Sequence, residues 1–253
     1  MTFSKLADEF ARWVDAGLSP RLWLRDDDAI APTPALERLI VLSAHCQAPI
    51  LLAIIAQPAQ AALAERLADV ALLTPCQHGY AHRNHAGAGE RAVELGGARS
   101  LEVIGHELAA GRQRLIALFG DRLSRILVPP WNRIDANLVG RLPALGFGTL
   151  STFGPPRVDG IVGLGELNCH VDLIDWRGGR VGKSPERLEG ELVSAFALAR
   201  EEGGRAVGFL THHLAHDAQA WASFDTLCHW LAGRGISFAD AVTLTGDHAL
   251  SRS

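Results

Sequence analysis

The chain has 253 residues, 48% of them hydrophobic, which is enough for a substantial buried core. Its 24 basic and 28 acidic residues are interspersed and form no basic stripe of the kind that phosphate backbones require, so we expect no nucleic-acid partner. The four cysteines are far apart and form no C-x-x-C pair, which favours reduced thiols over a disulfide framework.

The first predicted element is an amphipathic helix near the N-terminus. Leu6, Phe10, Trp13 and Val14 recur at helical spacing, and the segment lacks the basic start and unbroken apolar core of a secretion signal. Elsewhere no apolar run approaches the ~20 residues that a membrane-spanning helix needs. We therefore expect a cytoplasmic protein without a membrane span.

From residue 22 onward, short apolar runs alternate with longer stretches of helical period. Such alternation is typical of a parallel sheet or barrel with crossover helices. The predicted strands are 22–25, 49–55, 71–76, 125–128, 148–153, 167–173, 206–210 and 236–239. The predicted helices are 36–45, 59–67, 100–119, 136–145, 185–200 and 219–231. The stretches 86–97 and 154–165 are predicted to be long loops, and we expect one α/β domain over residues 1–253.

Three adjacent carboxylates, Asp26, Asp27 and Asp28, follow the first predicted strand. Like charges at the end of a buried strand repel one another and are costly unless a cation or a basic partner compensates them. A bound metal ion provides such compensation. The alternative is a solvated acidic turn or a helix N-cap before Thr33-Pro34. Strict strand alternation would place Asp26 and Asp28 on the same face.

Two histidines follow the third predicted strand. His78 and His82 are four residues apart, so one helical turn can present both imidazoles to a single ion, and one carboxylate completes a typical catalytic ligand set. The alternative, two unrelated surface histidines, is disfavoured because both follow an apolar strand and lie near His85. We expect one divalent ion, with zinc first and cobalt, nickel, iron or manganese as alternatives.

A further histidine, His212, follows the strand predicted at 206–210. Imidazole titrates near neutrality, so His212 is a candidate general acid or base, the alternative being a hydrogen-bonded core histidine. His213 and His216 rank behind it, because neighbouring positions at a strand end point in different directions. The sequence gives no role to His85 or His170.

These clusters resemble, in the same order, the five motifs of the polysaccharide deacetylases, carbohydrate esterase family 4. The matching segments are Asp27-Asp28, His78-x-x-x-His82, Pro129-Pro130-Trp131, Asp172-x-x-Asp175-Trp176 and Leu210-Thr-His212, all within residues 22–217. The resemblance implies a distorted (β/α) barrel of about seven parallel strands. It also implies a metal-dependent hydrolase that cleaves a linear amide bond.

The resemblance carries a role to each matched position. Asp28, His78 and His82 would hold the metal ion, while Asp27 would be the general base and His212 the general acid. The residues that would contact or surround the substrate are Trp131, Asn132, Arg133, Trp176 and Leu210. Trp131 stands where the family uses a backbone N–H to stabilise the oxyanion. Asp175 stands where a carboxylate would orient His212.

The third motif departs from the family pattern. The arginine that normally contacts the catalytic aspartate is replaced by Val128, which leaves Arg25 or Arg133 to substitute for it. We favour Arg25, because it precedes Asp27 by two residues and would share its strand face. This departure affects the prediction of the substrate more than the prediction of the metal site.

The leading functional prediction is removal of an acetyl or formyl group from the nitrogen of an amino sugar or a sugar-linked intermediate. One alternative is an amidase of the same superfamily that acts on a small non-carbohydrate amide. The other is a catalytically silent sugar-binding or scaffold protein, which the missing arginine favours. The expected partner is a small-molecule or glycan N-acyl substrate, and the sequence makes no prediction of the oligomeric state.

Overall fold

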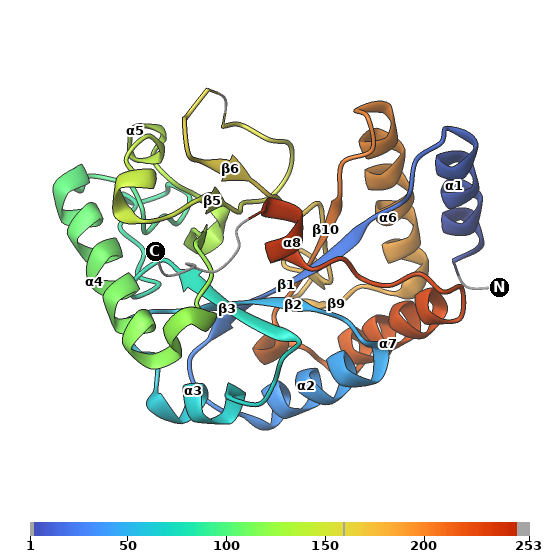
Figure 1. Ribbon diagram of the computed structural model, residues 1–253, viewed down its shortest axis with the longest axis horizontal. Helices are drawn as coiled ribbons and strands as arrows, with labels where there is room; N and C mark the ends of the chain where they lie inside the picture. Colours follow the sequence, from blue (N-terminus) through green and yellow to red (C-terminus); the bar gives the residue numbers. More distant parts are fainter. Residues whose placement is uncertain (1–2, 159, 247–253) are drawn as a thin grey trace. The chain divides into compact units, whose positions relative to one another are not determined.

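The computed structural model describes residues 3–158 and 160–246, and helices alternate with strands along the chain (Figure 1). The strands are β1 (Leu22–Ala29), β2 (Ile50–Ile54), β3 (Leu73–His78), β4 (Ile126–Val128), β5 (Thr149–Leu150), β6 (Gly165–Glu166), β7 (Val171–Asp172), β8 (Ile174–Asp175), β9 (Val181–Gly182) and β10 (Val207–Thr211). The helices are α1 (Ser4–Asp15), α2 (Pro34–Cys46), α3 (Ala61–Leu67), α4 (Leu101–Phe119), α5 (Ala136–Val139), α6 (Pro185–Glu201), α7 (Ala218–Ala232) and α8 (Ala241–Thr245). Short 3₁₀ turns include η2 (Pro130–Asn132) and η4 (His213–Ala215).

Eight of the strands form one sheet in the order β6-β5-β4-β3-β2-β1-β10-β7, while β8 and β9 form a separate antiparallel pair. The pairs β1–β10, β10–β7, β3–β4, β4–β5 and β5–β6 are all parallel. Parallel neighbours need crossover connections, which the intervening helices provide. The predicted α/β class is confirmed, with one strand more than the approximately seven expected.

Several predicted boundaries differ from the structure. The segment 236–239 is not a strand, because pairing stops after the single bridge between Ala239 and Trp23 and α8 begins at Ala241. The predicted helix 136–145 ends at Val139 and is followed by Gly140, a residue with poor helix propensity. In the other direction, β1 is longer than predicted and carries the acidic triplet.

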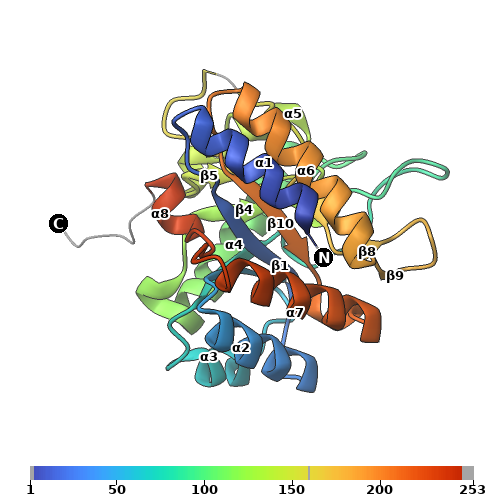
Figure 2. The ribbon, with the colours of Figure 1, turned by 90° about the vertical axis from the view of Figure 1, so that its right-hand side faces the viewer.

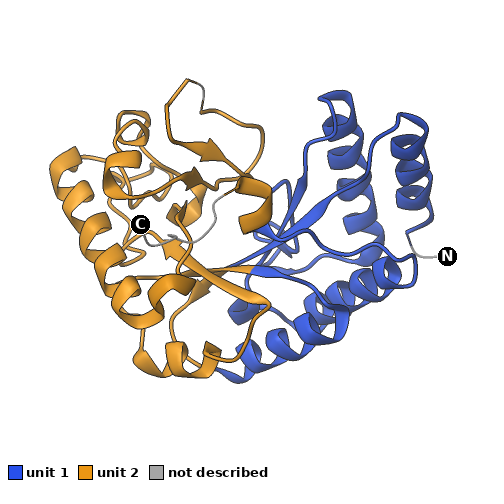
Figure 3. Ribbon diagram, in the orientation of Figure 1, with its two compact units in different colours: residues 1–26, 33–50, 169–241 blue, residues 27–32, 51–168, 242–253 orange. Residues whose placement is uncertain are grey.

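The chain divides into two compact units, coloured separately in Figure 3. Unit 1 comprises residues 1–26, 33–50 and 169–241, and unit 2 comprises residues 27–32, 51–168 and 242–253. The boundary falls inside β1, so Asp26 belongs to unit 1 and Asp27 to unit 2. A single domain over 1–253 stays a prediction.

In unit 1, helices α1 and α6 lie side by side in both views (Figures 1 and 2). The rings of Phe10 and Phe196 meet edge to face at 4.8 Å, and the Trp13 indole N–H donates to the Phe196 carbonyl at 3.1 Å. The predicted N-terminal helix is thus confirmed, although Val14 is 68% exposed. No helix of the described residues is both long and apolar enough to cross a bilayer, and the cytoplasmic location stays a prediction.

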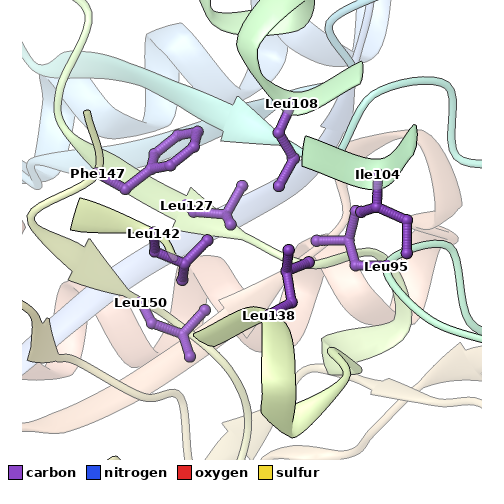
Figure 4. Packing of buried hydrophobic residues seen from close by; sticks show 8 residues of the cluster. All are labelled: Leu95, Ile104, Leu108, Leu127, Leu138, Leu142, Phe147 and Leu150. Atoms are coloured by element: carbon purple, nitrogen blue, oxygen red, sulfur yellow. The ribbon is translucent and has the colours of Figure 1, made fainter. Parts of the chain in front are cut away.

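The core of unit 2 fixes the strand that leads into the third motif. Leu127 of β4 belongs to the same buried hydrophobic cluster as Ile104 and Leu108 of α4 (Figure 4). The remaining buried members of this cluster are Leu95, Leu138, Leu142, Phe147 and Leu150. Full burial of each such side chain contributes about 1.5–3 kcal/mol. This packing holds the end of β4, directly before the Pro-Pro-Trp segment.

Candidate metal centre

The acidic triplet lies on a strand and does not cap a helix. The N-cap of α2 is Thr33, whose hydroxyl oxygen accepts from the Leu36 backbone N–H at 3.1 Å. Asp27 is buried, with 2% of its surface exposed, while Asp28 is half-buried. At Asp28 the backbone has φ +76°, so strict strand alternation ends there. The alternation argument that placed Asp26 and Asp28 on one face therefore does not apply.

Three predicted ligands converge in unit 2. The Oδ1 atom of Asp28 lies 3.1 Å from His78 Nε2 and 3.3 Å from His82 Nε2. Each of these residues offers one ligand atom, and the three atoms lie within 4.8 Å of one another. Two imidazoles and one carboxylate match the ligand set of catalytic zinc sites.

The hydrogen bonding of His78 tests whether this group suits a cation. His78 Nδ1 lies 3.0 Å from the carbonyl oxygen of Val128, which can only accept, so Nδ1 carries a proton. In a neutral ring, Nε2 then directs a lone pair at Asp28 Oδ1, which is also an acceptor. Two acceptors 3.1 Å apart repel unless a proton or a metal ion lies between them. The tautomer fixed by a backbone carbonyl is also the usual arrangement of a ligating histidine, so the residues fit a divalent ion.

The lowered pKa of His82 also suits metal binding. Burial lowers the pKa of His82, and His78 lowers it further, against Asp28 and Glu94, which raise it. A lowered pKa favours the neutral imidazole at pH 7, which is the form that binds metal.

The two histidines do not converge by sharing a helical turn, as the spacing had predicted. His78 is the last residue of β3, and the segment that follows is irregular. Gly79 and His82 both have positive φ, +55° and +54°, and this loop returns the second imidazole towards the first. The ring centroids lie 5.2 Å apart. The three residues lie together, and their role as metal ligands stays a prediction, whereas the predicted helical turn between the histidines was wrong.

Left-handed backbone conformations gather around this cluster. Asp28, His82, Trp131 and Asn132 have φ values of +76°, +54°, +54° and +56°. For residues other than glycine, such conformations cost about 1–3 kcal/mol each and persist where the surrounding structure imposes them, often at functional sites. The Trp131 ring lies 4.3 Å from the His82 ring, so the third motif borders the metal ligands.

The η2 turn places the residues that follow Trp131. The backbone N–H groups of Asn132 and Arg133 donate to the carbonyls of Pro129 and Pro130, at 2.9 and 3.2 Å. The Arg133 guanidinium donates to the Ala92 carbonyl at 2.7 Å, in the loop 86–97. Burial lowers the pKa of Arg133, and nearby Arg91 lowers it further.

In unit 1, Asp26 is buried in a pair that the sequence did not predict. Asp26 Oδ2 accepts from the Thr211 hydroxyl at 2.6 Å and from the His213 backbone N–H at 2.9 Å, and Oδ1 lies 2.5 Å from His213 Nδ1. Burial raises the pKa of Asp26, but the charge and hydrogen bond of His213 outweigh it and hold the pKa below its ordinary value. Asp26 thus anchors the segment that carries His212.

Arg25, the favoured replacement for the missing arginine, is fully buried on β1, in register with Leu210 of β10. Leu210 is itself buried and pairs in register with Asp172 of β7. The substituting role of Arg25 and the acyl-pocket role of Leu210 stay predictions.

Trp176 and two aspartates, Asp172 and Asp175, bear on the predicted role of His212. The Trp176 ring packs edge to face on the His212 ring at 4.8 Å, and its indole N–H donates to Asp172 Oδ2 at 2.8 Å. Burial raises the pKa of Asp172, and the charge of His212 lowers it. Asp175 instead accepts hydrogen bonds from the Arg187 guanidinium and from the Gly178 N–H. Asp172 is thus a second candidate to orient His212, and the orienting role of Asp175 stays a prediction.

The different hydrogen-bond partners of the two aspartates predict an unequal effect of two matched variants. We expect Asp172→Asn to lower kcat more than Asp175→Asn, because the first removes the charge next to His212 and the second only a half-exposed ion pair with Arg187. Steady-state kinetics across pH would measure both. A larger loss of kcat in Asp175→Asn would favour Asp175 as the residue that orients His212.

Two further histidines of unit 1, His170 and His216, have structural partners. His170 Nδ1 accepts from the Gly208 N–H at 3.0 Å, and burial, with Arg205, lowers its pKa to about 4. His216 packs edge to face on Trp221 at 4.4 Å, and burial lowers its pKa to about 4. Both are neutral at pH 7 and contribute to packing.

No protein-family model matches the sequence, and no curated protein matches it significantly. Solved structures do match. A putative polysaccharide deacetylase from Mycobacterium smegmatis aligns with a TM-score of 0.66 at 14% identity, over 91% of this chain and 90% of that one. A family 4 carbohydrate esterase from Streptomyces lividans, solved with acetate, aligns with a TM-score of 0.58 at 16% identity, over 92% and 98%.

A third similar structure is a pseudoenzyme of the same family from Bacillus anthracis, with a TM-score of 0.59 at 14% identity, over 89% of this chain and 65% of that one. The chain therefore has the fold of the carbohydrate esterase family 4 polysaccharide deacetylases, which confirms the fold class that the motif resemblance implied. Because that fold occurs in both enzymes and a pseudoenzyme, it does not decide activity.

Proposed function

We propose that the protein is a metal-dependent hydrolase that removes an acetyl or formyl group from the nitrogen of an amino sugar or a sugar-linked intermediate. The observation that carries this proposal is the position of Asp28 Oδ1 opposite the Nε2 atoms of His78 and His82, at 3.1 and 3.3 Å. With Nδ1 of His78 committed to a carbonyl, this arrangement suits a cation. It occurs on a fold whose known members include deacetylases.

Asp28, His78 and His82 would hold the ion, which supplies Lewis-acid polarisation of a carbonyl and acidification of a water molecule. Asp27 follows Asp26 on β1, is buried, and would take the proton of the attacking water. The Trp131 segment borders His82, so its backbone can face the developing oxyanion.

The leaving amine needs a proton, because a free amide anion is a very poor leaving group. His212 would donate it. Asp172, which accepts from the same Trp176 indole that packs on His212, would orient the imidazole. Trp176 contacts both residues and would fix the ring edge to face.

The nature of the acyl group follows from analogy with the esterase structure that contains acetate, the product of hydrolysis of an N-acetyl group. A small non-carbohydrate amide is the alternative substrate, since the metal chemistry is the same for any unactivated amide. A panel that includes N-acetyl and N-formyl amino sugars beside simple amides separates these cases.

The experiment that tests the proposal measures metal content and acid release together. We expect near-stoichiometric divalent metal in the wild type and its loss in His78→Ala and His82→Ala, because each variant removes one of three ligands. Elemental analysis measures the metal, and acetate or formate release from the panel measures turnover. Wild-type protein that binds no divalent ion in any preparation would contradict the metal centre itself.

A silent binding protein is the second candidate, favoured by one observation. Val128 replaces the arginine of the third motif, and its buried side chain cannot supply a cation. A pseudoenzyme also shares this fold. Stoichiometric metal without acid release from any member of the panel would favour this candidate.

A further inference from the structure

A buried glutamate in the loop 86–97 is not used by the proposed mechanism. Glu94 is 1% exposed and lies in unit 2, as do the metal ligands. Its Oε1 accepts from the backbone N–H groups of Ala81 at 2.7 Å and Arg83 at 3.2 Å, and its Oε2 accepts from that of Tyr80 at 2.9 Å. One carboxylate thus accepts hydrogen bonds from three backbone N–H groups.

These three donors belong to the segment that joins the two histidine ligands. Tyr80 and Ala81 lie between His78 and His82, and Arg83 follows directly. The segment has no helix or strand of its own, so few other backbone hydrogen bonds define it; one is that from Gln57 N–H to the Tyr80 carbonyl at 2.7 Å. The Glu94 carboxylate therefore satisfies backbone N–H groups that a helix or strand would otherwise satisfy, and in this way it orders the segment.

The close approach of Glu94 also explains the glycine in this segment. A Cβ at Gly79 would lie 2.1 Å from Glu94 Oε2 and 2.6 Å from the Pro130 ring, and the backbone there has φ +55°. Both constraints select glycine. The chain immediately after His78 is thus adapted to the buried carboxylate.

The chemistry of the contact requires a carboxylate. An ionised glutamate has only acceptors, and charge-assisted bonds to N–H groups are about twice as strong as neutral ones. Glutamine would keep the shape but replace one acceptor with an NH₂ group that faces backbone donors. A buried donor left facing donors is destabilising.

We propose that Glu94 is a positioning residue of the metal centre: its carboxylate fixes the backbone from Tyr80 to Arg83, holds His82 in its left-handed conformation and so sets the affinity for the ion. The anchoring of the loop stands by itself, and only its consequence for metal rests on the proposed function. Glu94 does not contact the ion or the substrate in this role.

The anchoring is tested on the full chain without metal, by amide hydrogen exchange. We expect the Tyr80, Ala81 and Arg83 amides to be protected in the wild type, and to exchange about tenfold faster or more in Glu94→Gln. The matched control is Glu90→Gln, because Glu90 lies in the same loop, is exposed, and accepts from Gly87 N–H at 2.9 Å. It should leave the three amides unchanged.

The consequence for metal is tested by Zn²⁺ titration against a competing chelator. We expect Glu94→Gln to bind Zn²⁺ about 10–100-fold more weakly than the wild type, as for other residues that support metal ligands, and Glu90→Gln to bind as the wild type does. Glu94→Asp, which keeps the charge on a shorter side chain, should fall between wild type and Glu94→Gln in both affinity and exchange. A purely structural residue would lower stability without this graded change in affinity.

Each outcome bears on one claim. Unprotected amides in the wild type, or equal exchange in wild type and Glu94→Gln, would overturn the anchoring even if Glu94→Gln proved too unstable to titrate. Faster exchange with unchanged Zn²⁺ affinity would overturn the positioning role. A wild type that binds no Zn²⁺ but shows the protected amides would contradict the proposed function and leave the anchoring in place.

Discussion

Replacing Asp27 by asparagine is expected to lower kcat about 10²–10⁴-fold while the protein keeps its metal. Asparagine has nearly the same shape but cannot accept the proton of the attacking water. Asp27 is 2% exposed and directly precedes Asp28, whose Oδ1 lies beside both histidines. The variant should therefore lose turnover and keep its bound metal.

Steady-state kinetics and elemental analysis of the same preparation check this expectation. Asp121→Asn makes the same chemical change at an exposed position just after α4 and should match the wild type. Asp28→Asn is the informative partner, because it should lose metal as well as activity. If Asp27→Asn lost the metal and Asp28→Asn retained it, the roles of the two aspartates would be reversed.

The second large effect is on stability. We expect Asp26→Asn to lower the free energy of unfolding at pH 7 by about 3–5 kcal/mol, because removal of one partner from a buried ionic pair leaves the other uncompensated. Asp26 and His213 are both buried, and the Asp26 carboxylate also accepts from Thr211. Urea unfolding measures the difference. Exposed Asp8→Asn on α1 is the control and should lie within about 0.5 kcal/mol of the wild type.

The pH dependence of this difference has a defined sign. The folded-state pKa of Asp26 lies below its ordinary value of 3.8, so the carboxylate contributes stability that is present above that pH. The contribution is lost as the pH falls through the folded-state pKa. The gap between wild type and Asp26→Asn should accordingly be full at pH 5–7 and shrink below pH 3.8. A gap independent of pH would indicate that packing, and not the charge, carries the effect.

The sequence by itself determined the fold class and most of the candidate ligand set. Alternating apolar runs and helical periods predicted the parallel sheet, because burial periodicity is a local property. The position of the acidic triplet and of His78 and His82 directly after buried strands predicted a metal site at one edge of such a sheet, and the motif resemblance selected Asp28 as the third ligand. Their convergence within unit 2 agrees with that argument.

Only the tertiary structure decided how those side chains are held. The φ of +76° at Asp28 ends the strand alternation, and the loop from His78 to His82 replaces the expected helical turn. Trp176 contacts both His212 and Asp172, while Asp175 forms an ion pair with Arg187.

The pairing of Asp26 with His213 and the binding of Glu94 to three backbone amides had no signal in the sequence. In each case the deciding contact joins residues distant in sequence or depends on a backbone conformation that only the surrounding packing imposes. Local periodicity reports which face of an element is buried. The partner that a buried polar group finds depends on how distant segments pack around it.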